Sequence, residues 1–369
     1  MVEPSRASSL VTPPTVVAAV EALSEHPTEL VVYDRRGRKA TARAYPEVAR
    51  RARAFGAWFE ARGVRPGEVV FLCLPTGYDL VEAFLGAALV RALPCVLALP
   101  RAIGGLEVFR NRLGLLAEAF PGGHLLTTDS VGAEAGRAFW TPPTELDTGR
   151  LAPLDPIDPE ELAYVQLTSG STTEPKAVAI SHANVAANTR GIVLAGEGLG
   201  EAEDYVSWLP LYHDMGLVGM CLTALFHGSG LVLLSPEAFV GTPHRWLEAI
   251  AARAGRSVVT TAPNFGYQWC VDRIKPEKLV GLDLSPLRYA CCGAEMVRPE
   301  TLAAFRERFR PYGLREDVFA PCYGMAETTL AVTMTRPGPY RVHRGRVSCG
   351  VPIEGTRVRI VDPNTGSPL

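Results

Sequence analysis

A loop rich in hydroxyl-bearing and small residues surrounds one of the chain's few lysines. The residues "YVQLTSGSTTEPKAVAISH" place an apolar strand before a loop that ends at Lys176. Such a loop offers backbone N–H groups, hydroxyl donors and a cation, which are the groups that bind a polyphosphate. We therefore expect a phosphate site at Thr168, Ser169, Gly170, Ser171, Thr172, Thr173 and Lys176.

The position of this lysine separates the loop from two alternatives. Pro175 precedes it and Ala177 follows it, whereas the lysine of a nucleotide-binding P-loop follows a glycine and precedes a serine or threonine. An ordinary turn rich in serine and threonine is the other interpretation. The chain has four lysines and 33 arginines (37 − 4), so a lysine inside this loop favours the phosphate site.

Three further residues have types that suit phosphate and nucleotide chemistry. His213 in "SWLPLYHDMGLVG" is either a buried structural histidine or a functional group of the site. Tyr323 in "PCYGMAETTLAV" either packs in the core or stacks on a nucleotide base. Glu327 in the same segment is a carboxylate that could hold magnesium.

Five segments occur in the order typical of the adenylate-forming enzyme superfamily, which the chain resembles from about Thr41 to its last residue. They are "YVQLTSGSTTEPKAVAISH", "SWLPLYHDMGLVG", "TAPNFGYQWCVDRI", "LRYACCGAEMVRPETLAAF" and "PCYGMAETTLAV". The resemblance implies that ATP and Mg²⁺ are cofactors, with Lys176, His213 and Glu327 catalytic and with Thr172 and Glu327 holding the metal. Beyond the phosphate loop, it implies ATP contacts from Gly293, Ala294, Glu295, Tyr323, Gly324, Met325 and Ala326. It also implies an acyl pocket formed by His213, Gly216, Met220, Asn264 and Phe265.

The third of these segments is similar to the acyl-pocket helix of the fatty acyl-AMP ligases. That similarity implies ATP-dependent activation of a fatty or related carboxylic acid as acyl-AMP, with release of pyrophosphate. The acyl group would then pass to the thiol of an acyl carrier protein, in lipid, polyketide or lipopeptide biosynthesis. Two alternatives stay open: an acyl-coenzyme A ligase, and a fragment that binds acyl-adenylate without turnover.

The chain departs from the superfamily pattern at several positions. Thr173 and Ala177 stand where the phosphate loop usually has glycines, and Met220 stands where a smaller residue is common, which would narrow an acyl tunnel. The interval from Ala331 to Val347 is short for the insertion typical of fatty acyl-AMP ligases. Superfamily members continue into a C-terminal α+β domain with a catalytic lysine. Because no lysine follows Lys278, we expect that domain to be absent from this chain.

The spacing of apolar runs predicts an α/β fold. Strand-like runs such as "VVFLCLP", "CVLALP", "AYVQL", "YVSWLP", "GLVLLSP", "SVVTTAP" and "LRYACCG" alternate with helical stretches or glycine-rich loops, which predicts largely parallel sheets with flanking helices. "LVVYDRRGRKATA" predicts a two-stranded hairpin, and "RVSCG" and "RVRIVD" predict short strands after Pro337. We expect two packed subdomains over residues 1–195 and 196–336, and the start of a β-rich unit over residues 337–369.

Composition limits the classes of partner. The formal net charge of −2 gives no electrostatic reason to bind nucleic acid, and no apolar run reaches the ~20 residues that span a bilayer. The eight cysteines show no metal or redox spacing and sit mostly in apolar runs, which is typical of buried, reduced thiols. Since the first residues also lack the pattern of a secretory signal, we expect a cytoplasmic enzyme.

Overall fold

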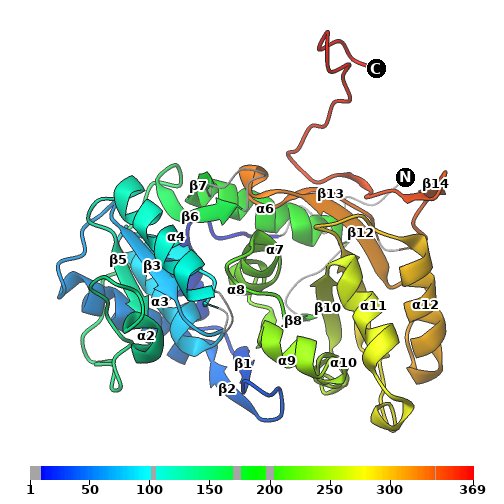
Figure 1. Ribbon diagram of the computed structural model, residues 1–369, viewed down its shortest axis with the longest axis horizontal. Helices are drawn as coiled ribbons and strands as arrows, with labels where there is room; N and C mark the ends of the chain where they lie inside the picture. Colours follow the sequence, from blue (N-terminus) through cyan, green and yellow to red (C-terminus); the bar gives the residue numbers. More distant parts are fainter. Residues whose placement is uncertain (1–9, 101–104, 169–175, 197–202, 337) are drawn as a thin grey trace.

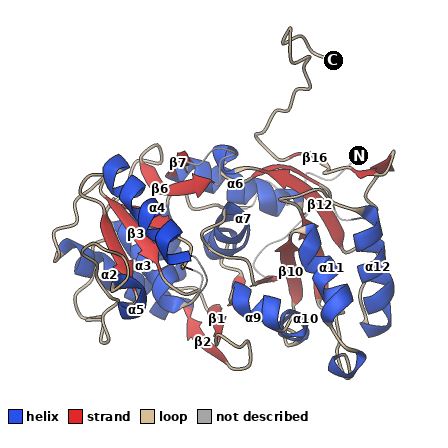
Figure 2. Cartoon of the chain, viewed as in Figure 1, coloured by secondary structure: helices blue, strands red, loops and turns tan. Residues whose placement is uncertain are grey.

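The computed structural model describes residues 10–100, 105–168, 176–196, 203–336 and 338–369. Among these, nine strands form one sheet in the order β16-β13-β12-β11-β10-β8-β9-β1-β2 (Figures 1 and 2). Its centre is parallel, and β2, β13 and β16 add antiparallel pairs toward the edges. The strands are β1 Glu29–Tyr33, β2 Ala40–Ala44, β8 Glu203–Ser207, β9 Gly230–Leu233, β10 Ser257–Ala262, β11 Leu287–Cys292, β12 Phe319–Gly324, β13 Ala331–Met334 and β16 Val351–Pro352.

Side chains from alternate positions of these strands enter two different cores. Val206, Val258 and Cys292 pack on one face with the helices α10 and α11. Tyr205, Val259 and neighbouring residues pack on the opposite face, with α6 and a π-helical turn. The covering helices are α9 Pro236–Gly241, α10 His244–Ala251, α11 Asn264–Arg273 and α12 Pro299–Phe309 on the first face, and α1 Val16–Leu23, α6 His182–Ala195, the π-helical turn η2 Leu217–Leu222 and α8 Thr223–Phe226 on the second. The short helix α7 Asp214–Gly216 contributes Met215 to the first core.

A second, smaller sheet has the parallel order β4-β3-β5 among the described strands. Every residue of its central strand is buried, as expected for a parallel strand covered on both faces. Helices α2, α3 and α4 lie around this sheet (Figure 1). The bounds are β3 Val69–Cys73, β4 Leu93–Val96, β5 His124–Thr127, α2 Tyr45–Glu60, α3 Tyr78–Leu89, α4 Gly105–Ala119 and α5 Asp129–Gly132.

The predicted parallel α/β architecture is confirmed, and so is the hairpin, whose strands β1 and β2 pair antiparallel. The pairing partners of the hairpin were not predicted. Strand β1 pairs in parallel with β9, so residues 29–44 belong to the larger sheet although they come early in the sequence. Sheet membership thus crosses the proposed division between residues 1–195 and 196–336.

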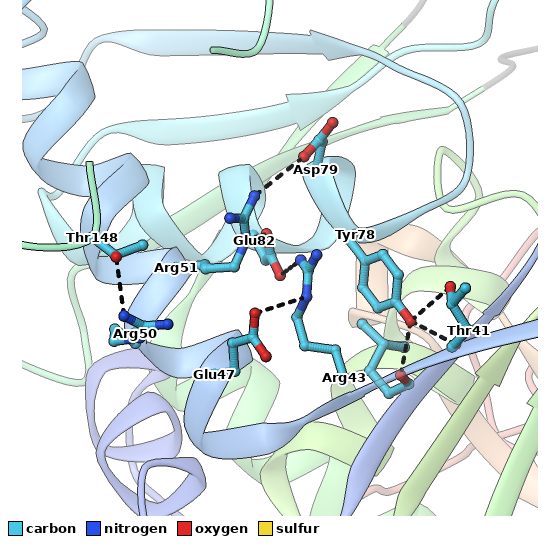
Figure 3. Close-up of polar contacts among 10 residues, drawn as sticks. Thr41, Arg43, Glu47, Arg50, Arg51, Tyr78, Asp79, Glu82 and Thr148 are labelled. Carbon is cyan, nitrogen blue, oxygen red and sulfur yellow. Dashed lines mark hydrogen bonds and ion pairs between the residues drawn. The ribbon is translucent and has the colours of Figure 1, made fainter. Parts of the chain in front are cut away.

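A buried carboxylate fixes this hairpin to the helices of the smaller sheet (Figure 3). The carboxylate of Glu82, on α3, is fully buried and accepts hydrogen bonds from Arg43 on the hairpin side and Arg51 on α2. The Arg43 guanidinium also lies 4.0 Å from the ring centroid of Tyr78, whose hydroxyl donates to the Thr41 carbonyl at 2.6 Å. The two sheets are therefore joined by charge as well as by apolar packing.

Two predicted strands differ in the structure. Strand β6 (Leu162–Thr168), expected in a parallel sheet, pairs antiparallel with β7 (Lys176–Ser181), because these two strands flank one loop. The run "RVRIVD" forms no strand beyond an isolated bridge between Val361 and Pro368. Ile360 is 68% exposed in this segment, which extends away from the rest of the molecule in Figure 1 and has no core to pack against. The remaining short strands after residue 337 are β14 Val342–His343 and β15 Arg346–Val347.

No helix among the described residues has the length and apolar character needed to cross a bilayer. The cysteines of the described residues are all free. Cys291 and Cys292 are buried on opposite faces of the larger sheet, as their adjacent positions in a strand predict.

Candidate functional site

A cavity of about 550 Å³ lies where the smaller sheet, the β6–β7 pair, the π-helical turn and the larger sheet meet. Its wall combines charged residues with apolar ones, so that it can hold a ligand with both kinds of group. Ten of the residues predicted from the sequence line it: Thr168, Lys176, His213, Met220, Ala294, Tyr323, Gly324, Met325, Ala326 and Glu327.

The phosphate-loop strands bring their hydroxyl and cation together. Thr168 ends β6 and is the register partner of Lys176, which begins β7. Both line the cavity. The five predicted residues between them, Ser169, Gly170, Ser171, Thr172 and Thr173, lie outside the described residues. The described part of the loop therefore presents an ammonium group and a hydroxyl beside the cavity.

A second cation in the cavity wall was missed by the sequence reasoning. Arg112, on α4, lines the cavity together with Lys176 and makes no ion pair with any described residue. By contrast, Arg110 on the same helix is paired with Glu134 at 2.6 Å. Arg112 sits in an amphipathic helix of unremarkable composition, so nothing in its local sequence distinguishes it from a surface arginine. Its position follows only from the way α4 packs beside β4 and β6.

The predicted histidine is held at the start of a short helix. His213 caps α7, and its Nδ1 lies 2.7 Å from Oδ1 of Asp214, a residue that is itself buried and lines the cavity. The Met215 N–H donates to the same carboxylate oxygen at 2.6 Å, which fixes the orientation of Asp214. The imidazole is about half exposed toward the cavity side. With Nδ1 facing the Asp214 carboxylate, the imidazolium form of this ring can donate from Nε2 to an anionic ligand.

A buried amide ties the histidine segment to the phosphate-loop strands. Gln166 on β6 donates from Nε2 to the carbonyl oxygens of Tyr212 at 2.9 Å and of Leu167 at 3.1 Å. It also lines the cavity. Gln166 was not singled out in the sequence, because an amide within an apolar strand carries no chemistry until its partners are known.

The glutamate lies in a single 3₁₀ turn, η5 (Ala326–Thr328), directly after β12. Asn188 on α6 holds this turn: its Nδ2 donates to the carbonyls of Thr328 (3.2 Å) and Ala331 (3.0 Å), and its Oδ1 accepts from the Ala331 N–H (3.0 Å). Glu327 lines the cavity and makes no ion pair with another described residue. Its carboxylate is therefore available to a ligand or a metal ion.

The aromatic residue before this turn is placed for contact with a ligand. Tyr323 lines the cavity and is 51% exposed, although it is a large aromatic side chain. Gly324 follows it where a Cβ atom would lie 2.0 Å from the Leu330 carbonyl oxygen, so only glycine fits between β12 and β13. Ala294 also lines the cavity and has a φ of +64°, which is rare for a residue with a side chain.

Five predicted residues lie elsewhere, mostly in supporting positions. Gly293 and Gly216 are required by close backbone, since added Cβ atoms would lie 2.8 Å from the Cys322 carbonyl oxygen and 2.4 Å from the Pro210 carbonyl oxygen. Glu295 accepts from the Phe265 N–H at 2.7 Å and so caps α11. Asn264 is buried and accepts from the Arg298 N–H at 2.9 Å, and Phe265 packs edge-on against Trp208. None of these five lines the cavity among the described residues.

The chemistry of the donor set fits a magnesium ion held together with a nucleotide. No group of three or more histidine, cysteine or acidic side chains suitable for a metal occurs in the described parts of the chain. Mg²⁺, however, is commonly held by one or two carboxylates and by the phosphate oxygens of a substrate. Glu327 supplies one such carboxylate beside the phosphate-loop strands.

Comparison with known proteins places this chain in a family. A family model described as "AMP-binding enzyme" matches residues 20–99 and 118–369. The chain belongs to the AMP-binding enzyme family. The solved fatty acyl-adenylate ligase of L. pneumophila, in complex with acyl adenylate and pyrophosphate, superposes with a TM-score of 0.86 at 29% identity, covering 96% of this chain and 66% of that protein.

Curated relatives of this AMP-binding enzyme carry more than one kind of name. A Caulobacter vibrioides protein provisionally named an acyl-CoA synthetase is 33% identical over 332 residues, which is 88% of this chain and 58% of the relative. The 4-hydroxyphenylalkanoate adenylyltransferase of Mycobacterium marinum is 34% identical over 310 residues, 79% of this chain and 47% of the relative. The chain thus spans about half the length of these relatives.

Proposed function

We propose that the protein activates a fatty or related carboxylic acid with ATP, forming acyl-AMP and pyrophosphate. The observation that carries this proposal is the single cavity lining shared by Lys176, His213, Tyr323 and Glu327, which come from three separate segments of the sequence. Membership of the AMP-binding enzyme family and the similarity to an acyl-adenylate-bound structure support it.

The reaction needs little covalent chemistry from the protein. An oxygen of the acid's carboxylate attacks the α-phosphorus of ATP, a new P–O bond forms, and the bond to the β-phosphate breaks with its electrons leaving on pyrophosphate. Catalysis then rests on holding the two reactants in line and on neutralising the charge of the leaving group.

Each proposed residue has one part in this task. Lys176 and Arg112 supply positive charge beside the polyphosphate, while His213, oriented by Asp214, donates to the carboxylate of the acid. Tyr323 stacks on the adenine ring. Glu327, together with Thr172 of the phosphate loop, would hold Mg²⁺, which would supply positive charge beside the phosphates when bound.

We propose an acyl carrier protein thiol as the acceptor of the activated acyl group. Coenzyme A is the second candidate, because the Caulobacter vibrioides relative is named for that acceptor. Loading of a carrier protein and formation of acyl-coenzyme A, measured from the same acyl-AMP, separate the two.

Exchange of labelled pyrophosphate into ATP, with a panel of carboxylic acids, tests the proposed activation. Lys176→Ala and Glu327→Ala should each slow the exchange. Each should raise its activation free energy by about 2–4 kcal/mol, the cost of removing one preorganised charged group. Affinity for the acid should change little, because neither residue contacts the acyl chain. Near-normal exchange in both variants would contradict the assignment of the phosphate site.

A further inference from the structure

Five side chains from three neighbouring strands form what we call the floor of the cavity. Tyr205 on β8 is the register partner of Val259 on β10, and Val259 in turn pairs with Tyr289 on β11. Two residues further along, Thr261 pairs with Cys291. Because alternate residues of a strand share one face, all five project from the same side of the sheet. All five line the cavity.

One hydroxyl in this floor is buried without a partner. The side chain of Tyr205 is fully buried, and its Oη makes no hydrogen bond with any residue that the structure describes. The hydroxyl of Tyr289, two strands away, donates instead to the Thr335 carbonyl, and Tyr45 elsewhere in the core donates to the Ser229 carbonyl. Buried hydroxyls in native proteins are nearly always paired, and because Tyr205 lines the cavity, a bound ligand can supply the partner that the described residues do not.

Apolar side chains line the cavity over this floor. The π-helical turn that carries Met220 packs against β8 and β10, and the buried Met220 side chain lines the same cavity. Ile192 on α6 lines it as well. An acyl chain would therefore meet a mostly hydrocarbon wall that contains the unpaired hydroxyl of Tyr205.

We propose that the acid accepted by this protein carries a hydroxyl or carbonyl oxygen on its acyl portion, and that this oxygen hydrogen-bonds with Tyr205. The inference rests on the proposed adenylation of a carboxylic acid and narrows the class of acid. A plain alkyl chain would leave the tyrosine hydroxyl unpaired, whereas an oxygenated chain of equal size would pair it. A site built around such a group rejects the analogue that lacks it more strongly than an apolar pocket rejects a change in size.

The structure supplies a matched control for this tyrosine. Tyr164 on β6 is also fully buried, and its hydroxyl also lacks a partner, but Tyr164 does not line the cavity. Tyr205→Phe and Tyr164→Phe each remove one buried unpaired oxygen and keep the ring. Neither variant should have a lower melting temperature than the parent protein, because neither loses a hydrogen bond. A clear drop for Tyr205→Phe would show that its hydroxyl is paired within the protein and would overturn the proposal.

Binding of non-hydrolysable acyl sulfamoyladenosines, measured by calorimetry, gives the decisive test without requiring turnover. Two pairs of probes suffice: 3-(4-hydroxyphenyl)propanoyl against 3-phenylpropanoyl, and ω-hydroxydecanoyl against decanoyl. We expect the oxygenated member of at least one pair to bind the parent protein about 10-fold tighter or more. That preference should fall below about 3-fold in Tyr205→Phe and persist in Tyr164→Phe.

The outcomes distinguish this inference from the proposed function. Equal affinities within both pairs, or a preference that survives in Tyr205→Phe, would overturn the role of Tyr205 while leaving adenylation intact. Failure of all four probes to bind would contradict the proposed function itself, and the inference with it.

Discussion

Lys176 and Arg112 both line the cavity, yet only the lysine stands out in the sequence. Lys176 is one of four lysines and lies in a loop of hydroxyl-bearing residues, whereas Arg112 is one of 33 arginines on an ordinary amphipathic helix. One lysine would neutralise only a small part of the negative charge of a polyphosphate. The unpaired guanidinium on α4 is therefore expected to contact the phosphates of ATP.

Arg112→Gln should raise the KM for ATP and for pyrophosphate in the exchange reaction by about 10-fold or more, the scale of one lost charge-assisted hydrogen bond. The KM for the acid should stay within about 2-fold, since the expected contact is with phosphate. Arg110→Gln is the control, because Arg110 lies on the same helix and is paired with Glu134. Equal effects of the two substitutions would attribute the change to α4 as a whole rather than to Arg112.

The residues predicted from sequence and those missed differ in what defines them. Lys176, His213, Tyr323 and Glu327 lie in segments with recognisable local patterns, and the structure brings all four to one cavity. Tyr205 lies in an apolar strand whose pattern indicates only burial. Its unpaired hydroxyl depends on contacts among β8, β10 and the π-helical turn, which are far apart in sequence, so no local pattern could reveal it.

At the scale of elements, the hairpin β1–β2 depends on the carboxylate of Glu82 for its connection to α2 and α3 (Figure 3). Glu82→Ala would leave the guanidinium groups of Arg43 and Arg51 without their shared partner, and each is only about one-fifth exposed. We expect a loss of roughly 3–5 kcal/mol in unfolding free energy, the cost of breaking a buried ion pair from one side. Urea unfolding measures it.

Asp79→Asn is the matched comparison for that substitution. Asp79 is half exposed, and its carboxylate lies 3.8 Å from Arg51, so its removal should cost less than about 1 kcal/mol. If Glu82→Ala were equally mild, the ion cluster would contribute little to holding the two sheets together.

The predicted elements also differ in how well the sequence determined them. "VVFLCLP" and "SVVTTAP" predict buried strands, and β3 and β10 confirm them. "RVRIVD" alternates polar and apolar residues and so also predicts a strand, but no neighbouring strand pairs with it along its length within the described chain. Alternation therefore predicts the capacity to form a strand, while pairing decides whether one forms.

At the scale of the whole molecule, stability should depend on two buried histidines. Burial lowers the pKa of His182 and of His227 to about 4. Nδ1 of His182 accepts a hydrogen bond from the Val16 N–H at 3.2 Å, which joins α6 to α1 and requires the neutral ring. In the unfolded chain these groups take up protons near pH 6.5, so between about pH 6.5 and 4 the unfolded state binds more protons.

Stability should therefore fall as the pH is lowered through that window and should be unaffected by these groups above it. Across this window each histidine changes the unfolding free energy by at most roughly 3 kcal/mol, because burial lowers its pKa by about 2.5. Urea unfolding between pH 7.5 and 4 should show a weaker pH dependence in His182→Gln, whereas the exposed His343→Gln should match the parent protein. If the unfolding free energy of His182→Gln depended on pH as steeply as that of the parent protein, His182 would not become protonated on unfolding.

The parallel pairing of β1 with β9 also dictates an order of events during synthesis. Leu30 pairs with Leu231, so the first strand of the larger sheet leaves the ribosome 201 residues (231 − 30) before its parallel partner. At about 5–20 residues per second, that interval is roughly 10–40 seconds. Arg43, Arg51 and Glu82 emerge within the first quarter of the chain, so the ion cluster can form while β1 still lacks its neighbour. Until β9 has been synthesised, β1 has one unpaired strand edge, and the ion cluster holds the nascent hairpin against α2 and α3.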